Sequence, residues 1–353
     1  MPDPDTHDRD HSSGHAEESL ILRCAASSER VIVSRSIVRC ALALAGALAA
    51  PVAASQTEQP QQEPRPAGDV VRITGQRLRP GLHVLMSGNN GNIGVWHGAD
   101  GIVVIDDGLA PLAPEVLEAI RQVADGPIRF VINTHWHPDH TGGNELLGKS
   151  GGIVFAHENV RVRMSEEQFI ELIDMRVPPA PAAALPVVTF DDSLTFHLNG
   201  DRLDVVHVSD AHTDGDAVLR WQAANVVHTG DVYFNGSYPF IDLDSGGTLA
   251  GLVAAIEAIL ARANDATVVI PGHGPVSNRR ELSEYRDMLV TIGRRIREGV
   301  ESGRNLDEVL ASRPTAEFDA RYGQGSITAT RLVGTLYRDL TRPKPGLRPS
   351  GRN

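Results

Sequence analysis

The sequence predicts an α/β protein in which two β-sheets pack face to face between outer helices, a four-layer αββα sandwich. Short apolar runs rich in Val and Ile recur along the chain, and they come in two rounds. Each round is followed by segments with helical spacing, and no linker between the rounds is long enough to separate two domains. Periodicity alone leaves other α/β layouts open.

The first round begins near Val70 and alternates strands with helices. We expect helices at 111–124, from near Gly143, and at 157–176, where apolar residues have helical spacing. The expected strands are β-branched runs bounded by turn residues, at 82–86, 93–96, 101–105, 128–132 and 153–156.

The second round follows a Pro- and Ala-rich loop at 177–186, which is the best candidate for a lid because it lies between elements. Helices are expected at 248–263, 279–303, 306–312 and 327–340. The expected strands are at 187–190, 194–198, 203–208, 217–221, 225–228 and 267–270.

The N-terminal region has the pattern of an export signal. Arg35 and Arg39 precede the apolar run 40–50, which small residues follow up to Ser55. The run is shorter than the about 20 residues that span a bilayer, so no stable membrane insertion is expected after cleavage. A buried N-terminal helix is the alternative. We therefore expect a periplasmic or secreted protein with a signal peptide at 35–55.

The remaining boundaries follow from composition. Residues 1–34 are polar and are predicted to be either disordered or a leader upstream of the true translation start. The Gln- and Pro-rich stretch 56–69 is predicted to be a linker, 70–342 one folded domain, and 343–353 a frayed tail.

Charge and cysteine content exclude several classes of protein. The net charge of −12 disfavours nucleic acid as a partner, because phosphate backbones require a basic surface. The two cysteines, Cys24 and Cys40, both precede the expected mature start. A metal site in the mature chain must therefore use nitrogen and oxygen ligands.

Ligand-type residues cluster directly after the expected strand 128–132. His135 and His137 are two apart in an extended stretch, so their side chains point the same way and converge on one ion. Asp139 and His140 follow Pro138, where the chain turns, and face a second position. Imidazole and carboxylate ligands suit zinc and related ions. A polar loop with incidental histidines is the alternative.

Three further ligand types follow other expected strands. His212 lies in a loop after 203–208, Asp231 after 225–228, and His273 after 267–270. Each is weak by itself, because a lone histidine is more often structural than a ligand. Together they form a consistent set at one rim of the fold. Seven ligands also exceed a structural zinc site, which is four-coordinate and closed.

The succession of these motifs resembles the metallo-β-lactamase superfamily over roughly residues 84–276. The resemblance implies the αββα sandwich and two Zn²⁺ ions per chain, with iron or manganese as alternatives. It implies that His135, His137 and His212 hold the first metal, that Asp139, His140 and His273 hold the second, and that Asp231 bridges the two. Asp106 matches the family's aspartate that orients ligands, with a turn aspartate as the alternative.

The stretches 89–92, 141–144 and 211–213 look closest to zinc β-lactamases that use a cysteine at the second metal, but two positions depart from them. Asp231 stands where those enzymes have the cysteine, and His140 adds a ligand, so the site resembles glyoxalase II here. Phe234 stands where a lysine usually holds the substrate carboxylate, and Asn235 or an arginine is the candidate substitute. Trp96, Phe234 and Tyr238 are candidates for an apolar substrate wall, with ordinary packing as the alternative.

The function expected from these residues is hydrolysis of a small carbonyl substrate. Two metals lower the pKa of a bridging water, and the resulting hydroxide attacks the carbonyl carbon. Asp139 orients the hydroxide and passes the hydroxide's proton to the leaving group. β-Lactamase-like cleavage of a cyclic amide is the first interpretation, and a lactonase or thioesterase is the second. An iron-dependent persulfide dioxygenase is a remote third. The sequence leaves the oligomeric state open.

Overall fold

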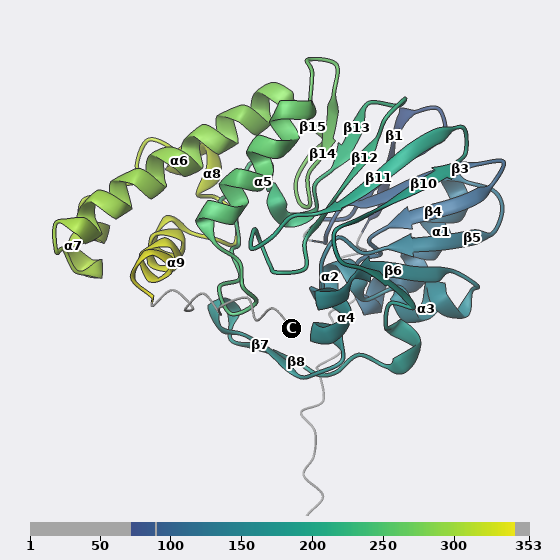
Figure 1. Ribbon diagram of the computed structural model, residues 1–353, viewed down its shortest axis with the longest axis horizontal. Coiled ribbons are helices and arrows are strands. Elements are labelled where there is room, and N and C mark those ends of the chain that lie inside the picture. The colour runs from purple at the N-terminus through teal and green to yellow at the C-terminus, as the bar shows by residue number, and fades with distance from the viewer. Residues whose placement is uncertain (1–71, 89, 343–353) are drawn as a thin grey trace, which may run out of the picture. The chain divides into compact units, whose positions relative to one another are not determined.

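The computed structural model describes residues 72–88 and 90–342 (Figure 1), which belong to one compact unit, 66–353. The predicted leader, signal peptide, linker and tail, at 1–34, 35–55, 56–69 and 343–353, lie outside the described residues. Among the described residues, no helix is both long and apolar enough to cross a bilayer.

The first sheet has seven strands in the order β1-β2-β3-β4-β5-β6-β9. Strands β1 to β4 pair antiparallel, whereas β4, β5, β6 and β9 pair parallel. Parallel pairing brings the carboxyl ends of β4, β5 and β6 to one edge. The strands are Thr74–Arg79, Leu82–Met86, Ile93–Gly98, Gly101–Ile105, Ile128–Ile132, Ile153–His157 and Val188–Phe190.

The second sheet has six strands in the order β10-β11-β12-β13-β14-β15. All neighbours pair antiparallel except β13 and β14, which are parallel and so end at the same edge. The strands are Ser193–Leu198, Asp201–His207, Ala217–Trp221, Val226–His228, Val268–Ile270 and Ser277–Asn278.

Three apolar clusters define the layers. One lies between the two sheets and includes Ile105 and Leu219. Another joins the outer face of the first sheet to α1, and the largest joins α5, α6 and α9 to the second sheet. The helices are α1 Ala113–Val123, α2 Pro138–Thr141, α3 Asn144–Lys149, α4 Glu158–Met164, α5 Leu249–Arg262, α6 Arg279–Glu301, α7 Leu306–Ala311, α8 Asp319–Tyr322 and α9 Ala329–Thr341. The αββα prediction is confirmed.

The predicted helix at 157–176 is wrong beyond Met164. Strands β7 (Gln168–Ile170) and β8 (Met175–Val177) follow instead and form a small antiparallel hairpin. Asp174, between them, has φ = 50°, a left-handed conformation that ends helical geometry. Ile170 belongs to the apolar cluster that contains Trp136, and Met175 packs against this cluster, so tertiary contacts override the helical spacing. Strands β1 and β15 and helix α8 were not predicted.

Candidate metal centre

The cluster 135–140 begins where β5 ends at the sheet edge. The backbone N–H of Ala217 in β12 donates to Thr134 O at 2.8 Å, which joins the two sheets at this point. His137 is extended and immediately precedes α2, which begins at Pro138. Asp139 and His140 therefore lie on a helical turn, as the proline predicted, and the His140 ring centroid lies 4.1 Å from that of His135.

Three imidazole nitrogens from distant segments meet at one point. His137 Nδ1 lies 3.2 Å from His135 Nε2 and 2.9 Å from His212 Nε2. All three residues are at most 3% exposed. Ligand atoms of these residues and Asp231 all lie within 4.8 Å of one another. The loops after β5 and β11 thus come together as expected.

The opposite ring nitrogens of these histidines are each held by an oxygen. His137 Nε2 donates to Asp242 Oδ2 at 3.0 Å, and His212 Nδ1 donates to the carbonyl of Phe240 at 2.8 Å. His135 Nδ1 lies 3.0 Å from Thr134 Oγ1, whose proton goes to a carboxylate, so the ring nitrogen is the donor there. A neutral imidazole has one N–H, so with all three rings neutral these bonds leave a lone pair on each of the facing nitrogens.

A second group lies beside the first and contains Asp139, His140 and His273, whose ligand atoms lie within 4.8 Å of one another. His273 Nε2 is 3.2 Å from Asp139 Oδ2 and 3.4 Å from His140 Nε2. His140 is buried, whereas the side chains of Asp139 and His273 are 27% and 20% exposed. The second group therefore faces solvent more than the first.

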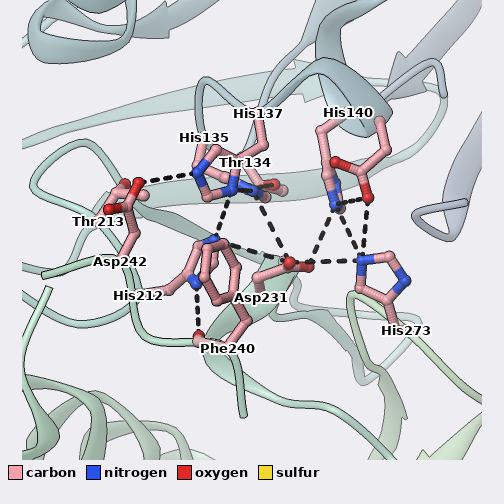
Figure 2. Close-up of polar contacts among 12 residues, drawn as sticks. Thr134, His135, His137, His140, His212, Thr213, Asp231, Phe240, Asp242 and His273 are labelled. Carbon is pink, nitrogen blue, oxygen red and sulfur yellow. Dashed lines mark hydrogen bonds and ion pairs between the residues drawn. The ribbon is translucent and has the colours of Figure 1, made fainter. Parts of the chain in front are cut away.

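Asp231 stands between the two groups (Figure 2). Its Oδ2 lies 3.7 Å from His212 Nε2 and 3.4 Å from His273 Nε2, and its Oδ1 lies 3.2 Å from His140 Nε2. Oδ1 is buried and has no partner in hydrogen-bond geometry. A carboxylate in this position can bridge two ions.

The electrostatics of the two groups differ. Burial lowers the pKa of His212 to about 4, so this ring is neutral and able to ligate at neutral pH. Burial also acts against protonated His140, but the carboxylates of Asp231, Asp139 and Asp106 outweigh it and raise the pKa of His140 well above its ordinary value. The second group therefore attracts positive charge, whether a proton or a metal ion.

Asp106 lies behind the ligands at the end of β4. Its carboxylate accepts from the backbone N–H and the hydroxyl of Thr134 at 2.7 and 2.8 Å, and from His140 Nδ1 at 2.8 Å. It is fully buried and has φ = 58°, a strained conformation that these bonds hold in place. Once the His140 ring is neutral, its bond to Asp106 keeps the proton on Nδ1 and leaves Nε2 with a lone pair that faces Asp231.

Glycines let neighbouring loops pack against the ligands. A Cβ at Gly91 would lie 2.4 Å from His140 Cε1, and one at Gly272 would lie 2.0 Å from Asp231 Oδ1. Asn92 holds the loop around Gly272 in place, because its side chain donates to the carbonyls of Pro271 and Gly274 at 2.9 and 2.8 Å.

The predicted substrate wall is only partly supported. The Phe234 ring lies 5.2 Å from the His273 ring with an interplanar angle of 3°, so it does border the centre. Asn235 supports the same loop, since its backbone N–H donates to His273 O and its side chain donates to Pro275 O, both at 2.9 Å. Asn235 thus uses both its backbone N–H and its side-chain NH₂ in hydrogen bonds within the protein.

Two residues of the predicted wall are corrected. Trp96 packs edge to face on Trp221 between the sheets and is 3% exposed. Tyr238 is 1% exposed and its hydroxyl donates to Asp319 Oδ1 at 2.8 Å, inside the helical cluster. Both are core residues, so packing of the sheets and helices buries the rings that the sequence pattern left ambiguous.

Sequence reasoning missed the groups that hold the histidines. Asp242 and Phe240 follow no strand end, and nothing in their local sequence points to a ligand. Phe240 also stacks on His137, with ring centroids 5.4 Å apart. Asp216 holds the backbone N–H groups of His212 and Thr213 at 2.6 and 2.9 Å. In the sequence, the only indication of a role for Asp216 is its position in the loop 209–216, four residues after His212.

Comparison with known proteins agrees with this geometry. A model of the metallo-beta-lactamase superfamily matches residues 87–273. A linear primary-alkylsulfatase from a Pseudomonas species is 25% identical over 254 residues, which are 60% of this chain and 47% of the relative. A hydroxyacylglutathione hydrolase from a Polaromonas species is 27% identical over 180 residues, covering 50% of this chain and 60% of the relative. The chain thus spans less than two thirds of these relatives.

Solved structures share the fold. A metallo-beta-lactamase from Pontibacter korlensis superposes with a TM-score of 0.51 and 21% identity, covering 62% of this chain and 99% of the other. A sec-alkylsulfatase from a Pseudomonas species has a TM-score of 0.57 and 19% identity, covering 75% of this chain and 50% of the other. At these identities the matches establish the fold alone.

Proposed function

Since this chain belongs to the metallo-beta-lactamase superfamily, we propose that it is a metallo-hydrolase that binds two zinc ions and hydrolyses a bond between a carbonyl carbon and a heteroatom. The observation that carries the proposal is the pair of adjacent ligand groups with Asp231 between them. In this proposal His135, His137 and His212 hold one ion, Asp139, His140 and His273 hold the other, and Asp231 touches both.

The residues fit such ions on chemical grounds. Three lone pairs face one another across 2.9 and 3.2 Å in the first group, an arrangement that repels unless a cation lies among them. The donor set of imidazole nitrogens and carboxylate oxygens suits zinc. The buried Asp231 Oδ1 without a hydrogen-bond partner is likewise an oxygen available to an ion.

When bound, zinc ions supply a water molecule of lowered pKa and polarise the substrate carbonyl. The chain itself supplies proton handling, which we assign to Asp139. Its side chain is 27% exposed, against 4% for Asp231, so a water and a leaving group can reach it. Its carboxylate is kept ionised, because His140 and His273 outweigh burial and hold the pKa of Asp139 well below its ordinary value.

The packing of Phe234 bears on the substrate class. Its ring lies flat on His273, at the position where a lysine would hold the carboxylate of a β-lactam. Because the ring presents no charge, it favours an uncharged group next to the scissile bond. This favours a lactone or thioester over a cyclic amide that carries a carboxylate. The related hydroxyacylglutathione hydrolase and alkylsulfatases indicate which further substrates to test.

The test is a substrate panel on the zinc-loaded protein: nitrocefin, an acyl-homoserine lactone, S-lactoylglutathione and dodecyl sulfate. His135→Ala, which removes a ligand of the first group, is the control. Turnover of the lactone or thioester that disappears in His135→Ala supports the proposal. Turnover of nitrocefin alone would favour a cyclic amide over a lactone or thioester as the substrate. Full activity in His135→Ala rules out the proposed centre.

Metal analysis tests the ions themselves. Protein purified without added metal should contain about two zinc ions per chain, and removing them with a chelator should abolish activity. Iron as the bound metal, together with oxygen consumption on a glutathione persulfide, would replace the hydrolase proposal with the dioxygenase alternative.

We also propose that the protein is exported after cleavage near Ser55. This rests on the sequence of the signal segment 35–55. N-terminal sequencing of the protein from the periplasm of its native host tests it, and intact residues 1–34 there would contradict it.

A further inference from the structure

A slot lies between the outer face of the second sheet and helix α5, and no ligand of the proposed metal centre lines it. Its volume is about 200 Å³, and it adjoins a surface groove of about 440 Å³ that shares Asp204, Val206, His207 and Arg262 with it. Apolar side chains of β11 and the residue after it, β12, β13 and α5 form its walls: Val206, Val208, Val218, Val227, Ala255, Ala258 and Ile259.

Small residues on α5 create the space. Ala255 and Ala258 are three apart, so they lie on one face of the helix, and that face lines the slot. Larger side chains at these positions would fill the gap above Val218 and Val227, which are 8% and 2% exposed. Figure 1 shows α5 alongside these strands, with α6 against its other side.

Two guanidinium groups line the same slot. Arg220 comes from β12, and its Nη1 is buried without a hydrogen-bond partner. Arg262 comes from the last turn of α5. Among residues 72–88 and 90–342, neither forms an ion pair with a carboxylate within 4.0 Å. Burial first, and then the charge of Arg262, lower the pKa of Arg220, and the Asp204 carboxylate opposes them without reversing the shift, so the two cations are close to each other.

The single carboxylate that lines the slot, Asp204, is engaged elsewhere. Its Oδ1 accepts from Thr195 Oγ1 at 2.9 Å and from Arg202 Nε at 2.7 Å, and its Oδ2 accepts from Gln222 Nε2 at 2.7 Å. The slot therefore combines apolar walls with a local excess of positive charge, in a chain whose net charge is −12.

We propose that this slot binds a small amphipathic anion, with its alkyl chain between α5 and the sheet and its carboxylate or sulfate against Arg220 and Arg262. A methylene group and a water molecule each occupy roughly 30 Å³, so a chain of about six or seven carbons fills the slot. The headgroup gives the buried Nη1 of Arg220 the partner that it lacks. This site is separate from the proposed hydrolysis and does not depend on it.

Calorimetric titration of the purified protein with butanoate, hexanoate, octanoate and decanoate tests the proposal. Affinity should rise about fourfold per methylene, as burial of apolar surface predicts, and should level off once the slot is full. Octanol and octylammonium have similar chains without the negative charge and should bind at least about fivefold more weakly than octanoate.

Substitutions locate the binding. Ala258→Leu should reduce octanoate affinity at least tenfold because the leucine occupies the slot, whereas Ala254→Leu, exposed on the same helix and outside the slot, should leave it unchanged. Arg262→Gln should weaken octanoate about fivefold without changing octanol, and Arg297→Gln is its exposed control.

A carboxylate also has affinity for zinc, so the same titration is run on His135→Ala. Octanoate binding that survives His135→Ala and is lost in Ala258→Leu supports the slot. Binding lost in His135→Ala and kept in Ala258→Leu would place the ligand at the metal centre and overturn the proposal. So would equal affinity for octylammonium, no saturable binding, or a change of oligomeric state caused by Ala258→Leu alone, which would assign the slot to a second copy.

Discussion

Asp242→Asn removes the carboxylate that fixes the tautomer of His137. Asp242 Oδ2 lies 3.0 Å from His137 Nε2, and the residue is 3% exposed. Its Oδ1 accepts from the backbone N–H groups of Asp244 and Ser245 at 3.2 and 3.1 Å, so the asparagine keeps its oxygen there and turns its NH₂ toward the ring. Two donors then face each other, and His137 must move its proton to Nδ1, the atom that faces the other ligands.

The expected loss in metal affinity follows from this geometry. Groups that hold a metal ligand from behind are typically worth about 10- to 100-fold in affinity, which corresponds to about 1.4 to 2.7 kcal/mol. Because the Asp242 carboxylate is buried and the substitution inverts its hydrogen bond to His137, we expect about a 100-fold weaker first zinc ion. Asp244→Asn changes an exposed neighbour and should shift the affinity less than about twofold.

Competition with a chromophoric zinc chelator measures both affinities, and circular dichroism checks that each variant is folded. If Asp242→Asn binds both ions as tightly as the unmodified protein, the reasoning from the His137 tautomer is wrong. If Asp244→Asn weakens zinc equally, the effect is one of general charge and not of the hydrogen bond.

Three further predictions follow from the site. Phe234→Lys should raise kcat/KM for nitrocefin about tenfold and lower it for a neutral thioester, because it adds a cation beside the scissile bond; equal changes for both substrates would contradict this. Gly91→Ala should abolish binding of the second zinc ion, since the added Cβ would lie 2.4 Å from His140 Cε1. Its control, Gly334→Ala, adds a Cβ with nothing within 4 Å and should raise Tm by about 1–3 °C. If Gly91→Ala still binds two zinc ions, the steric argument is refuted. Burial would lower the pKa of His273, but the neighbouring carboxylates raise it from 6.5 to about 9, so the metal-free protein should lose stability as pH rises from 6.5 through 9. Zinc loading at about pH 7.5 should then release a proton, detected with a pH indicator, and pH-independent zinc affinity in this window would count against it.

Much of the fold is encoded locally. The runs 82–86, 101–105 and 128–132 are strands at the predicted residues, because each combines β-branched side chains with flanking turn residues. The seven ligand-type residues were also found from the sequence, since their positions after strands and their order along the chain are local properties. Their resemblance to a known family supplied the division into two groups.

Contacts between distant segments decided the rest. The hairpin β7–β8 replaces a predicted helix because Ile170 and Met175 pack into the apolar cluster around Trp136, and local spacing does not encode that cluster. Burial of Trp96 and Tyr238, and the hydrogen bond from His137 to Asp242, 105 residues away, exist only once the sheets have packed. The sequence alone determined which side chains are able to ligate. The tertiary structure decided which oxygen holds each ring, because that depends on distances between atoms that the chain order does not fix.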